Sequence, residues 1–205
     1  MVTFEQFLAD AATKGEAVNI LFEEWLFGLV GIMHKITGAL ATEAIPYEVV
    51  GGLAVLIHVE EANPEHTTLT RDVDLMIRRA DLERLKEMAY LHGFRFRHEA
   101  GVDMLVYGET DSARNAVHLV FSGEKVRPHY DSPTPAINPV PKMILGQDVM
   151  VIPVVDLLKM KLTSNRDKDR VHIRAMDAAG LLTAAVEREL TGNQQARLQQ
   201  IRETE

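Results

Sequence analysis

The sequence of 205 residues contains no cysteine. Disulfide bonds and thiolate metal sites are therefore excluded, which suits a reducing compartment. The first residues, Met1 to Gln6, lack the basic and apolar regions of a secretory signal. The best candidate for a membrane span, around residues 26–36, is too short and is interrupted by glycine, histidine and lysine. We expect a cytoplasmic protein without a membrane partner.

Basic residues are also in the minority. The chain has 22 Lys and Arg residues against 30 Asp and Glu residues, a formal net charge of −8. Affinity for phosphate backbones depends on cationic side chains that replace counterions. Strong non-specific binding of nucleic acid is therefore not expected, and a polynucleotide partner would need a local basic patch.

The hydrophobic content of 46% is high enough for a substantial core. We predict an α+β fold in which a small mixed β-sheet is flanked by helices. Apolar residues at helical spacing, for example along residues 18–36, indicate an N-terminal helical segment over residues 1–45. The core then covers residues 46–152, and a C-terminal helical segment over residues 153–205 packs on it. We expect the three parts to form one compact unit.

Short aliphatic and β-branched runs predict the strands of the core. They cover residues 47–50, 70–77, 94–98, 104–107, 116–121 and 149–152. Residues 122–146 are rich in proline and glycine, which predicts a long ordered loop. Helices are predicted to follow the last strand at residues 154–164, from about residue 166, and at residues 184–202.

Two aspartates stand in the run that leads to Ile77. Alternate residues of a strand point to one face, so Asp72 and Asp74 would point the same way while Val73 and Leu75 pack into the core. Such a pair presents hard oxygen ligands for Mg²⁺ from a rigid element.

A glycine pair, Gly51 and Gly52, follows the first predicted strand and precedes a buried helix. This order places backbone N–H groups at a helix N-terminus, where the missing side chains let phosphates approach. Glycine pairs are often only turns, so the pair is weak evidence on its own.

Two further polar residues lie on predicted inner helix faces. At 3.6 residues per turn, Lys161 shares a face with Leu157 and Leu158, and Asp169 lies one turn before His172. A lysine there is either extended toward solvent or functional. For Asp169 the alternative is a first-turn carboxylate favoured by the helix dipole, with His172 as a hydrogen-bonded core histidine.

In combination these motifs resemble the polymerase-β-type nucleotidyltransferase superfamily. The strand, Gly-Gly and helix followed by Thr70-x-Asp72-x-Asp74 carry the resemblance. The later motifs Met160-Lys161-Leu162 and Arg166-x-Lys168-Asp169 resemble the AbiEii-like branch, which includes toxin components of toxin–antitoxin systems. The resemblance covers roughly residues 47–182.

The resemblance implies a nucleotidyltransferase core and assigns roles to residues. Gly51, Gly52 and Thr70 would bind the nucleotide, an NTP such as ATP. Asp72 and Asp74 would bind Mg²⁺, Lys161 would contact the triphosphate, and Asp169 would be the polar residue of the last motif. The implied partners are an acceptor, RNA or protein, and an antitoxin.

One position departs from the superfamily. Many members have a third carboxylate on a neighbouring strand, where this chain has His118. A neutral imidazole does not replace an anionic bridging ligand, but it can act as a general base for the acceptor hydroxyl. The alternatives are a hydrogen-bonded core histidine, a missing carboxylate supplied by Asp169, or a site that binds nucleotide weakly or not at all.

Two hypotheses follow. The first is a Mg²⁺-dependent nucleotidyltransferase that moves NMP from an NTP to an acceptor hydroxyl. The second is a catalytically silent nucleotide-binding or interaction module of the same fold. An RNA acceptor would be favoured by a basic rim of four side chains, Lys159, Lys168, Arg170 and Arg174, which are equally well explained as a solvated, salt-bridged helix face.

Overall fold

The computed structural model describes residues 26–108 and 116–204. The first part of the predicted N-terminal helical segment and the connection at residues 109–115 lie outside the described residues. Within the two described ranges, no helix is long and apolar enough to cross a membrane.

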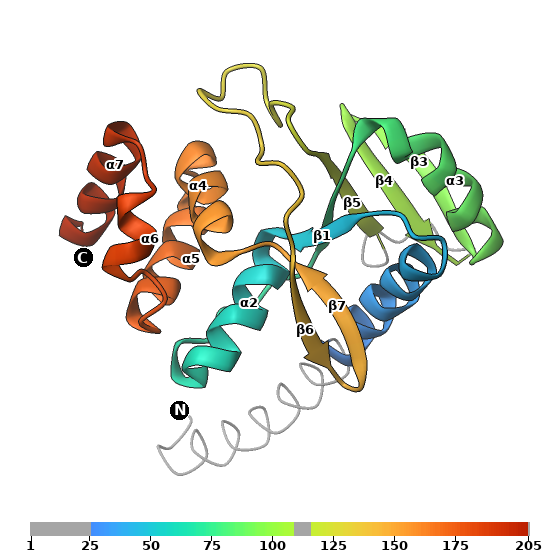
Figure 1. The fold of residues 1–205 in the computed structure, drawn as a ribbon, viewed down its shortest axis with the longest axis horizontal. Helices are drawn as coiled ribbons and strands as arrows, with labels where there is room; N and C mark the ends of the chain where they lie inside the picture. Colours follow the sequence, from blue (N-terminus) through green and yellow to red (C-terminus); the bar gives the residue numbers. More distant parts are fainter. Residues whose placement is uncertain (1–25, 109–115, 205) are drawn as a thin grey trace, which may run out of the picture.

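A seven-stranded mixed sheet forms the centre of the fold (Figure 1), in the order β3-β4-β5-β2-β1-β7-β6. Its strands are β1 (Tyr47–Val50), β2 (Val73–Ile77), β3 (Phe94–Glu99), β4 (Val102–Tyr107), β5 (Ala116–Phe121), β6 (Val140–Ile144) and β7 (Gln147–Val151). The pairs β2–β5 and β1–β7 are parallel, and the other four are antiparallel. The prediction of a mixed sheet is confirmed.

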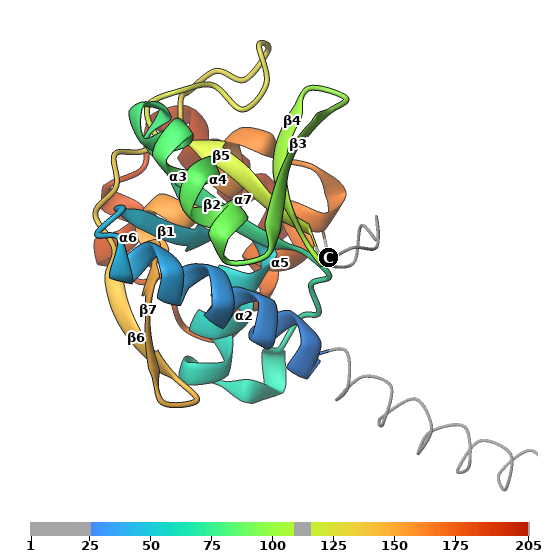
Figure 2. The same cartoon turned by 90° about the vertical axis from the view of Figure 1, so that its right-hand side faces the viewer.

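The helices cover the two faces of the sheet in separate groups. They are a helix at residues 26–42, α2 (Gly51–Ala62), α3 (Leu82–Leu91), α4 (Val154–Ser164), α5 (Asp167–Ala178), α6 (Ala184–Arg188) and α7 (Gly192–Glu203). In Figure 2 the helix at residues 26–42 and α3 lie in front of the strands, and α4 to α7 lie behind them. This arrangement confirms an α+β sheet flanked by helices.

Burial follows the periodicity of each element. On the helix at residues 26–42, the side chains of Leu29, Met33, Ile36 and Leu40 are at most 4% exposed, as expected for an apolar stripe at helical spacing. On β2, Val73 and Leu75 are buried and Asp74 between them is partly exposed. The central strand thus anchors itself in the core while it presents a carboxylate on the other face.

The predicted loop at residues 122–146 was wrong at its end. Residues Val140–Ile144 form β6, which pairs with β7. Proline is tolerated there because β6 lies at the edge of the sheet, so no further strand requires the N–H that proline lacks. Composition alone hid the strand because Pro139 directly precedes it and Pro141 is its second residue.

The predicted single helix at residues 184–202 was also wrong, since α6 ends at Arg188 and α7 begins at Gly192. Thr191 caps α7: its side chain accepts a hydrogen bond from the Gln194 N–H, and the Gln194 side chain accepts one from the Thr191 N–H. This capping box starts a new helix inside a helix-compatible sequence.

Candidate active site

A cavity of about 510 Å³ brings together most of the predicted site residues. It lies between the centre of the sheet, the segment that joins β5 to β6, and helices α4 and α5. Six predicted residues line it: Gly51, Asp72, Asp74, His118, Lys161 and Asp169. The other two, Gly52 and Thr70, pack against each other beside it.

The carboxylate pair is held by β2. Asp72 directly precedes the strand and Asp74 is its second residue, and both side chains line the cavity. Val73 between them is 1% exposed and packs in the core. The alternation predicted from the sequence therefore places both carboxylates at one cavity.

Gly51 allows the β1–α2 turn to approach Asp74. Its φ is +71°, and a Cβ at this position would lie 1.9 Å from Asp74 Oδ2. Both observations require glycine. Val50 at the N-cap gives α2 no side-chain cap, so the first N–H groups of the helix remain for other acceptors beside the carboxylate.

Gly52 has a different environment. A Cβ there would lie 2.4 Å from Thr70 Oγ1 and 3.3 Å from His172 Cε1. Thr70 is 9% exposed and His172 is 7% exposed. Gly52 therefore permits close packing of α2 on α5 and on the chain that leads to β2.

Lys161 points inward from α4, as its position on the helix predicts. It is 5% exposed, and its Nζ donates to Asp169 Oδ1 at 3.1 Å and to His172 Nδ1 at 3.0 Å. Burial lowers the pKa of the Lys161 ammonium, against the charge of Asp169. Burial, and next the charge of Lys161, lowers the pKa of His172 to about 4, so its ring is neutral at pH 7.

Asp169 is fully buried, and both of its oxygens have donors. Oδ1 accepts from Lys161, and Oδ2 accepts from Ser164 Oγ at 2.6 Å and Arg166 Nε at 2.8 Å. Burial alone would raise the pKa of this carboxyl, but the hydrogen bond from Arg166 and the charge of Lys161 hold it below its usual range. The geometry gives Asp169 the role of an anchor for cationic side chains, and it does not offer a free third carboxylate beside Asp72 and Asp74.

His118 lies directly beside Asp74. The two residues are register partners on β5 and β2, and His118 Nδ1 donates to Asp74 Oδ1 at 3.2 Å. This hydrogen bond raises the pKa of the imidazole, although burial opposes it. With Nδ1 occupied, Nε2 is the ring nitrogen left for a ligand.

The other end of the cavity is formed by β3, β4 and the segment after β5. Arg79 donates to Glu124 through Nε at 3.0 Å and to Asp103 through Nη1 at 3.3 Å, and its guanidinium lies over the Phe121 ring. Asp103 also accepts from His98 Nδ1. Charges of both signs meet at this end, where Arg79 is paired with Glu124 and Asp103.

Of the two interpretations of the four basic residues, a basic rim or a salt-bridged helix face, the contacts of three residues agree with the second. Lys159 pairs with Asp156 and Glu189, Arg170 donates to Asn165 Oδ1, and Arg174 donates to carbonyls at the end of α7. Only Lys168 of the four lines the cavity. Helical periodicity places these side chains on α4 and α5, but it does not specify which tertiary partner each one meets.

Sequence reasoning missed other cationic residues of the cavity. Arg166, Arg79, Lys125 and Arg127 line it together with Lys168. Arg166 stands in the quoted Arg166-x-Lys168-Asp169 motif, so its spacing from Asp169 was a usable signal. The residues of the segment after β5 had none, because no periodicity places that segment over the sheet.

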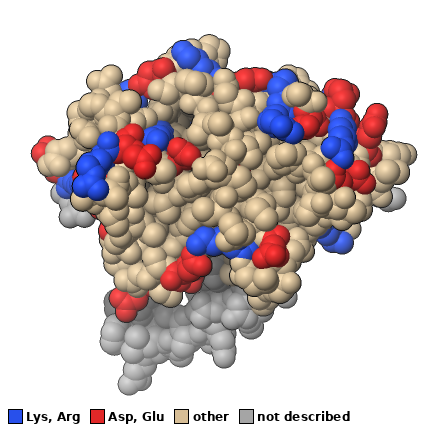
Figure 3. All heavy atoms as spheres, viewed as in Figure 1, with Lys and Arg blue, Asp and Glu red and all other residues tan. Residues whose placement is uncertain are grey.

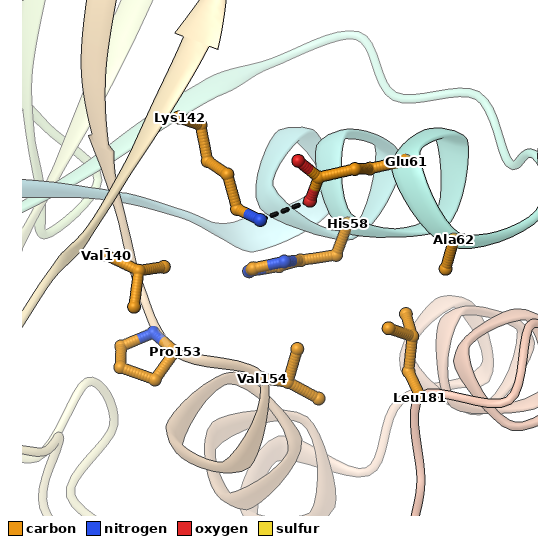
Figure 4. Close-up of a pocket in the computed structure, with 8 residues that line it drawn as sticks. All are labelled: His58, Glu61, Ala62, Val140, Lys142, Pro153, Val154 and Leu181. Atoms are coloured by element: carbon orange, nitrogen blue, oxygen red, sulfur yellow. Dashed lines mark hydrogen bonds and ion pairs between the residues drawn. The ribbon is translucent and has the colours of Figure 1, made fainter.

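A second cavity, of about 330 Å³, lies beside the C-terminal half of α2 and the start of α4 (Figure 4). Its walls are mainly apolar, and its polar groups have partners. Lys142 pairs with Glu61, and His58 Nε2 donates to the Ile152 carbonyl at 2.8 Å. It contains neither of the paired aspartates, so the larger cavity is the candidate site.

The Asp72 and Asp74 carboxylates are the groups of the cavity that could hold a magnesium ion. Among residues 26–108 and 116–204, no group of three or more His, Asp or Glu side chains is arranged around one metal position. Mg²⁺ needs only one or two protein carboxylates when substrate phosphates and water complete its shell. The two carboxylates at one cavity meet that requirement.

The comparisons with known proteins agree on the fold. No protein-family model matches the chain, and no curated protein sequence matches it. Among solved structures, the antigenic nucleotidyltransferase-like protein from Paracoccidioides brasiliensis is similar with a TM-score of 0.56 at 18% identity, over 85% of this chain and 87% of that one.

Two further structures are similar at lower identity. ANT(2'')-Ia in complex with adenylyl-2''-tobramycin has a TM-score of 0.53 at 15% identity, over 85% of this chain and 97% of that one. The Megavirus polyadenylate synthase has a TM-score of 0.52 at 12% identity, over 89% of this chain but 39% of that one. These likenesses show that the chain has the nucleotidyltransferase fold.

Proposed function

We propose that this protein is a nucleotidyltransferase that moves NMP from an NTP to an acceptor hydroxyl. One observation carries the proposal: a single cavity joins the Asp72 and Asp74 carboxylates, the Gly51 turn and the buried Lys161. Nucleotidyl transfer requires charge neutralisation around the α-phosphate and a cation near the leaving pyrophosphate. The cavity supplies groups for both.

Each residue then has a role. Asp72 and Asp74 would hold Mg²⁺, which when bound neutralises charge on the reacting phosphate. The N–H groups that begin α2 would bind phosphate oxygens, and Lys161 would bind the triphosphate as a point charge. Arg166 and Lys168 also line the cavity and add positive charge.

His118 has the geometry of a general base. Its Nδ1–H is directed at Asp74 Oδ1, so Nε2 would take the proton of the acceptor hydroxyl. The hydroxyl oxygen forms a bond to the α-phosphorus. The bond between the α-phosphorus and the oxygen that bridges it to the β-phosphorus breaks, and pyrophosphate leaves with the electron pair.

The acceptor would enter from the end of the cavity at Arg79, Asp103 and Glu124. We propose an RNA or protein hydroxyl as the acceptor. The fold is compatible with acceptors of different size, since one neighbour was solved with adenylyl-2''-tobramycin and another is a polyadenylate synthase. The Arg79 end carries paired charges of both signs, which favours local recognition over a long phosphate-binding track.

The assignment to the AbiEii-like branch, a cytoplasmic location and an antitoxin partner rest on the sequence motifs and composition. If the protein acts as such a toxin, its induced expression without a partner protein should arrest growth. Asp72→Asn should relieve that arrest at equal expression. Normal growth at high wild-type expression would argue against the toxin role.

The transfer reaction is tested directly with α-³²P-labelled NTPs, Mg²⁺ and total RNA or total protein. We expect a macromolecule to become labelled and the label to be lost with Asp72→Asn. Asp81→Asn, whose carboxylate pairs with Arg78 outside the cavity, is the control and should keep the activity. Labelling that survives Asp72→Asn would contradict the assignment.

A second function is favoured by the pairing of His118 with Asp74, since a histidine stands where many members of the superfamily that the sequence resembles have a carboxylate. In a silent nucleotide-binding module, NTP would bind but no transfer would follow, and His118→Gln would change nothing measurable in turnover. In the enzyme, His118→Gln should lower kcat by roughly 10²-fold or more while NTP affinity stays close to that of the wild type.

A further inference from the structure

The contact between Lys161 and His172 is not explained by packing alone. His172 lies on α5 and is 7% exposed, and its Nδ1 is 3.0 Å from Lys161 Nζ on α4. An apolar side chain of similar size would fill the same space without the cost of burying a ring nitrogen. Here that nitrogen has a partner, and the partner is the lysine of the candidate site.

The hydrogen-bond direction follows from the chemistry of the two groups. An ammonium has three donors and no acceptor, so His172 Nδ1 accepts and the ring proton lies on Nε2. Asp169 Oδ1 accepts a second donor of Lys161. One N–H of Lys161 remains, and Lys161 lines the cavity.

The same ring also packs against the glycine turn. A Cβ on Gly52 would lie 3.3 Å from His172 Cε1. The His172 ring thus contacts Lys161 through Nδ1 and the first turn of α2 through Cε1. These are the two elements expected to bind phosphate groups, and one buried ring sets the spacing between them.

We propose that His172 is a positioning residue that holds Lys161 and the α2 N-terminus in register for the phosphates of an NTP. Its acceptor nitrogen fixes the direction of the remaining Lys161 N–H, and its ring fixes the distance to the glycine turn. Asp169 alone would leave Lys161 free to rotate about a single hydrogen bond. The proposal rests on the proposed function, since it names a residue of the same nucleotide site.

Calorimetry with Mg²⁺ and a non-hydrolysable ATP analogue tests the proposal. His172→Leu keeps most of the apolar volume and removes the acceptor, so its Kd should rise about tenfold, the size expected for one hydrogen bond to a charged group. His172→Asn returns an acceptor oxygen close to the position of Nδ1 and should recover most of the affinity. Met176→Leu, a substitution in the buried face of the same helix, is the control and should bind as the wild type does.

A double-mutant cycle separates positioning from structure. In a Lys161→Met background, His172→Leu should raise Kd by a smaller factor than in the wild type, because only the spacing of the α2 turn is left for His172 to set. If the two substitutions raise Kd by independent factors that multiply, the inference is overturned while the proposed function stands. A folded His172→Leu protein with the Kd of the wild type would have the same consequence. Absence of binding by the wild-type protein would refute both.

Imidazole ¹⁵N NMR gives a readout that needs no nucleotide. In the wild-type protein at pH 7 the spectrum should show an unprotonated, hydrogen-bonded Nδ1 for His172, and Lys161→Met should shift that signal. A protonated Nδ1, or a signal that Lys161→Met does not change, would overturn the inference independently of nucleotide binding.

Discussion

Adjacent glycines at the start of α2 are required for different reasons. Gly51 has a left-handed φ and faces Asp74, whereas Gly52 has an ordinary φ and faces Thr70 and His172. Gly51 therefore belongs to the cavity wall and Gly52 to the packing behind it. The Gly51-Gly52 pair, interpreted from the sequence as one phosphate-binding turn, therefore meets two separate structural requirements.

Gly52→Ala should destabilise the fold by about 1–3 kcal/mol, the range for overpacking a close contact. The new Cβ would lie 2.8 Å from Thr70 Cβ, which moves only if the backbone moves. Gly28→Ala is the control, since a Cβ there meets nothing within 4 Å in an exposed helical position. It should stabilise by about 0.5–1 kcal/mol. Urea denaturation measures both, and equal stability of the two variants would contradict the packing argument.

Glu48 on β1 is a buried carboxyl without a charged partner. It is 0% exposed, its Oε1 accepts from the Asn138 N–H, and its Oε2 has no hydrogen-bond partner. Burial raises its pKa from 4.5 to about 7, and the charge of Asp156 adds to this effect. The residue ties the segment between β5 and β6 to the centre of the sheet.

The raised pKa of Glu48 predicts a pH dependence of stability. Below about pH 4.5 the carboxyl is protonated in both states, and between 4.5 and about 7 only the folded state holds the proton. Its contribution to stability therefore falls as pH rises through that window. Glu48→Gln removes the titration and should gain stability relative to the wild type between pH 5 and pH 8.

Urea denaturation at pH 5 and pH 8 measures that difference. Glu83→Gln, at a carboxyl that is 81% exposed, should show no such change between the two pH values. If the wild type and Glu48→Gln differ in their free energy of unfolding by the same amount at both pH values, Glu48 does not titrate in this range.

At the scale of elements, the first turn of α5 sends two cationic residues in different directions. Lys168 lines the cavity, while Arg170 donates to Asn165 at the end of α4. Lys168→Gln should weaken NTP binding by about 1 kcal/mol, or roughly fivefold in Kd, as for one solvent-exposed charge. Arg170→Gln removes the same charge two residues away and should leave Kd unchanged. Calorimetry at low salt compares them, and equal losses would mean that net charge, not position, controls binding.

The elements that could be predicted are those with their own periodicity. The alternation around Asp74 and the inward face of Lys161 follow from strand and helix geometry, and both hold in the structure. β6 was missed because its prolines are permitted only by its edge position, which is a property of the whole sheet. The division of α6 from α7 was missed because one capping threonine interrupts a helical composition.

The site residues could likewise be predicted only where they lie on elements with a clear periodicity. Residues that lie on regular elements, such as Asp74 and Lys161, could be placed at a common site from the sequence. The partners of Asp169 and Lys168 depend on how α4 and α5 meet, and no local pattern specifies that contact. The contact of His172 with Gly52 joins residues 120 positions apart in a packing interface, which spacing along one element does not show.

On the scale of the whole molecule, the helix at residues 26–42 and the C-terminal helices share a core with the sheet. Met33, Leu75 and Leu158 belong to one continuous cluster of buried residues. We predict that the chain unfolds in a single cooperative transition. Circular dichroism and tyrosine fluorescence should give coincident midpoints in urea, and two separated midpoints would show that one helical segment is an independent unit.

The charge distribution agrees with a specific site and not with a general affinity for polyanions. On the face seen in Figure 3, basic and acidic side chains lie next to one another and no extended basic patch is visible. Lys161, Arg166 and Lys168 instead contribute positive charge to the lining of the cavity. A small phosphate-bearing ligand is therefore the expected partner of that cavity.

Calorimetric titration with Mg²⁺ and a non-hydrolysable NTP analogue tests the central claim most directly. The wild-type protein should bind one equivalent in a saturable, Mg²⁺-dependent manner, and Asp74→Asn should abolish the Mg²⁺ dependence. No binding by the folded wild-type protein, or binding that Asp74→Asn leaves unchanged, would contradict the account.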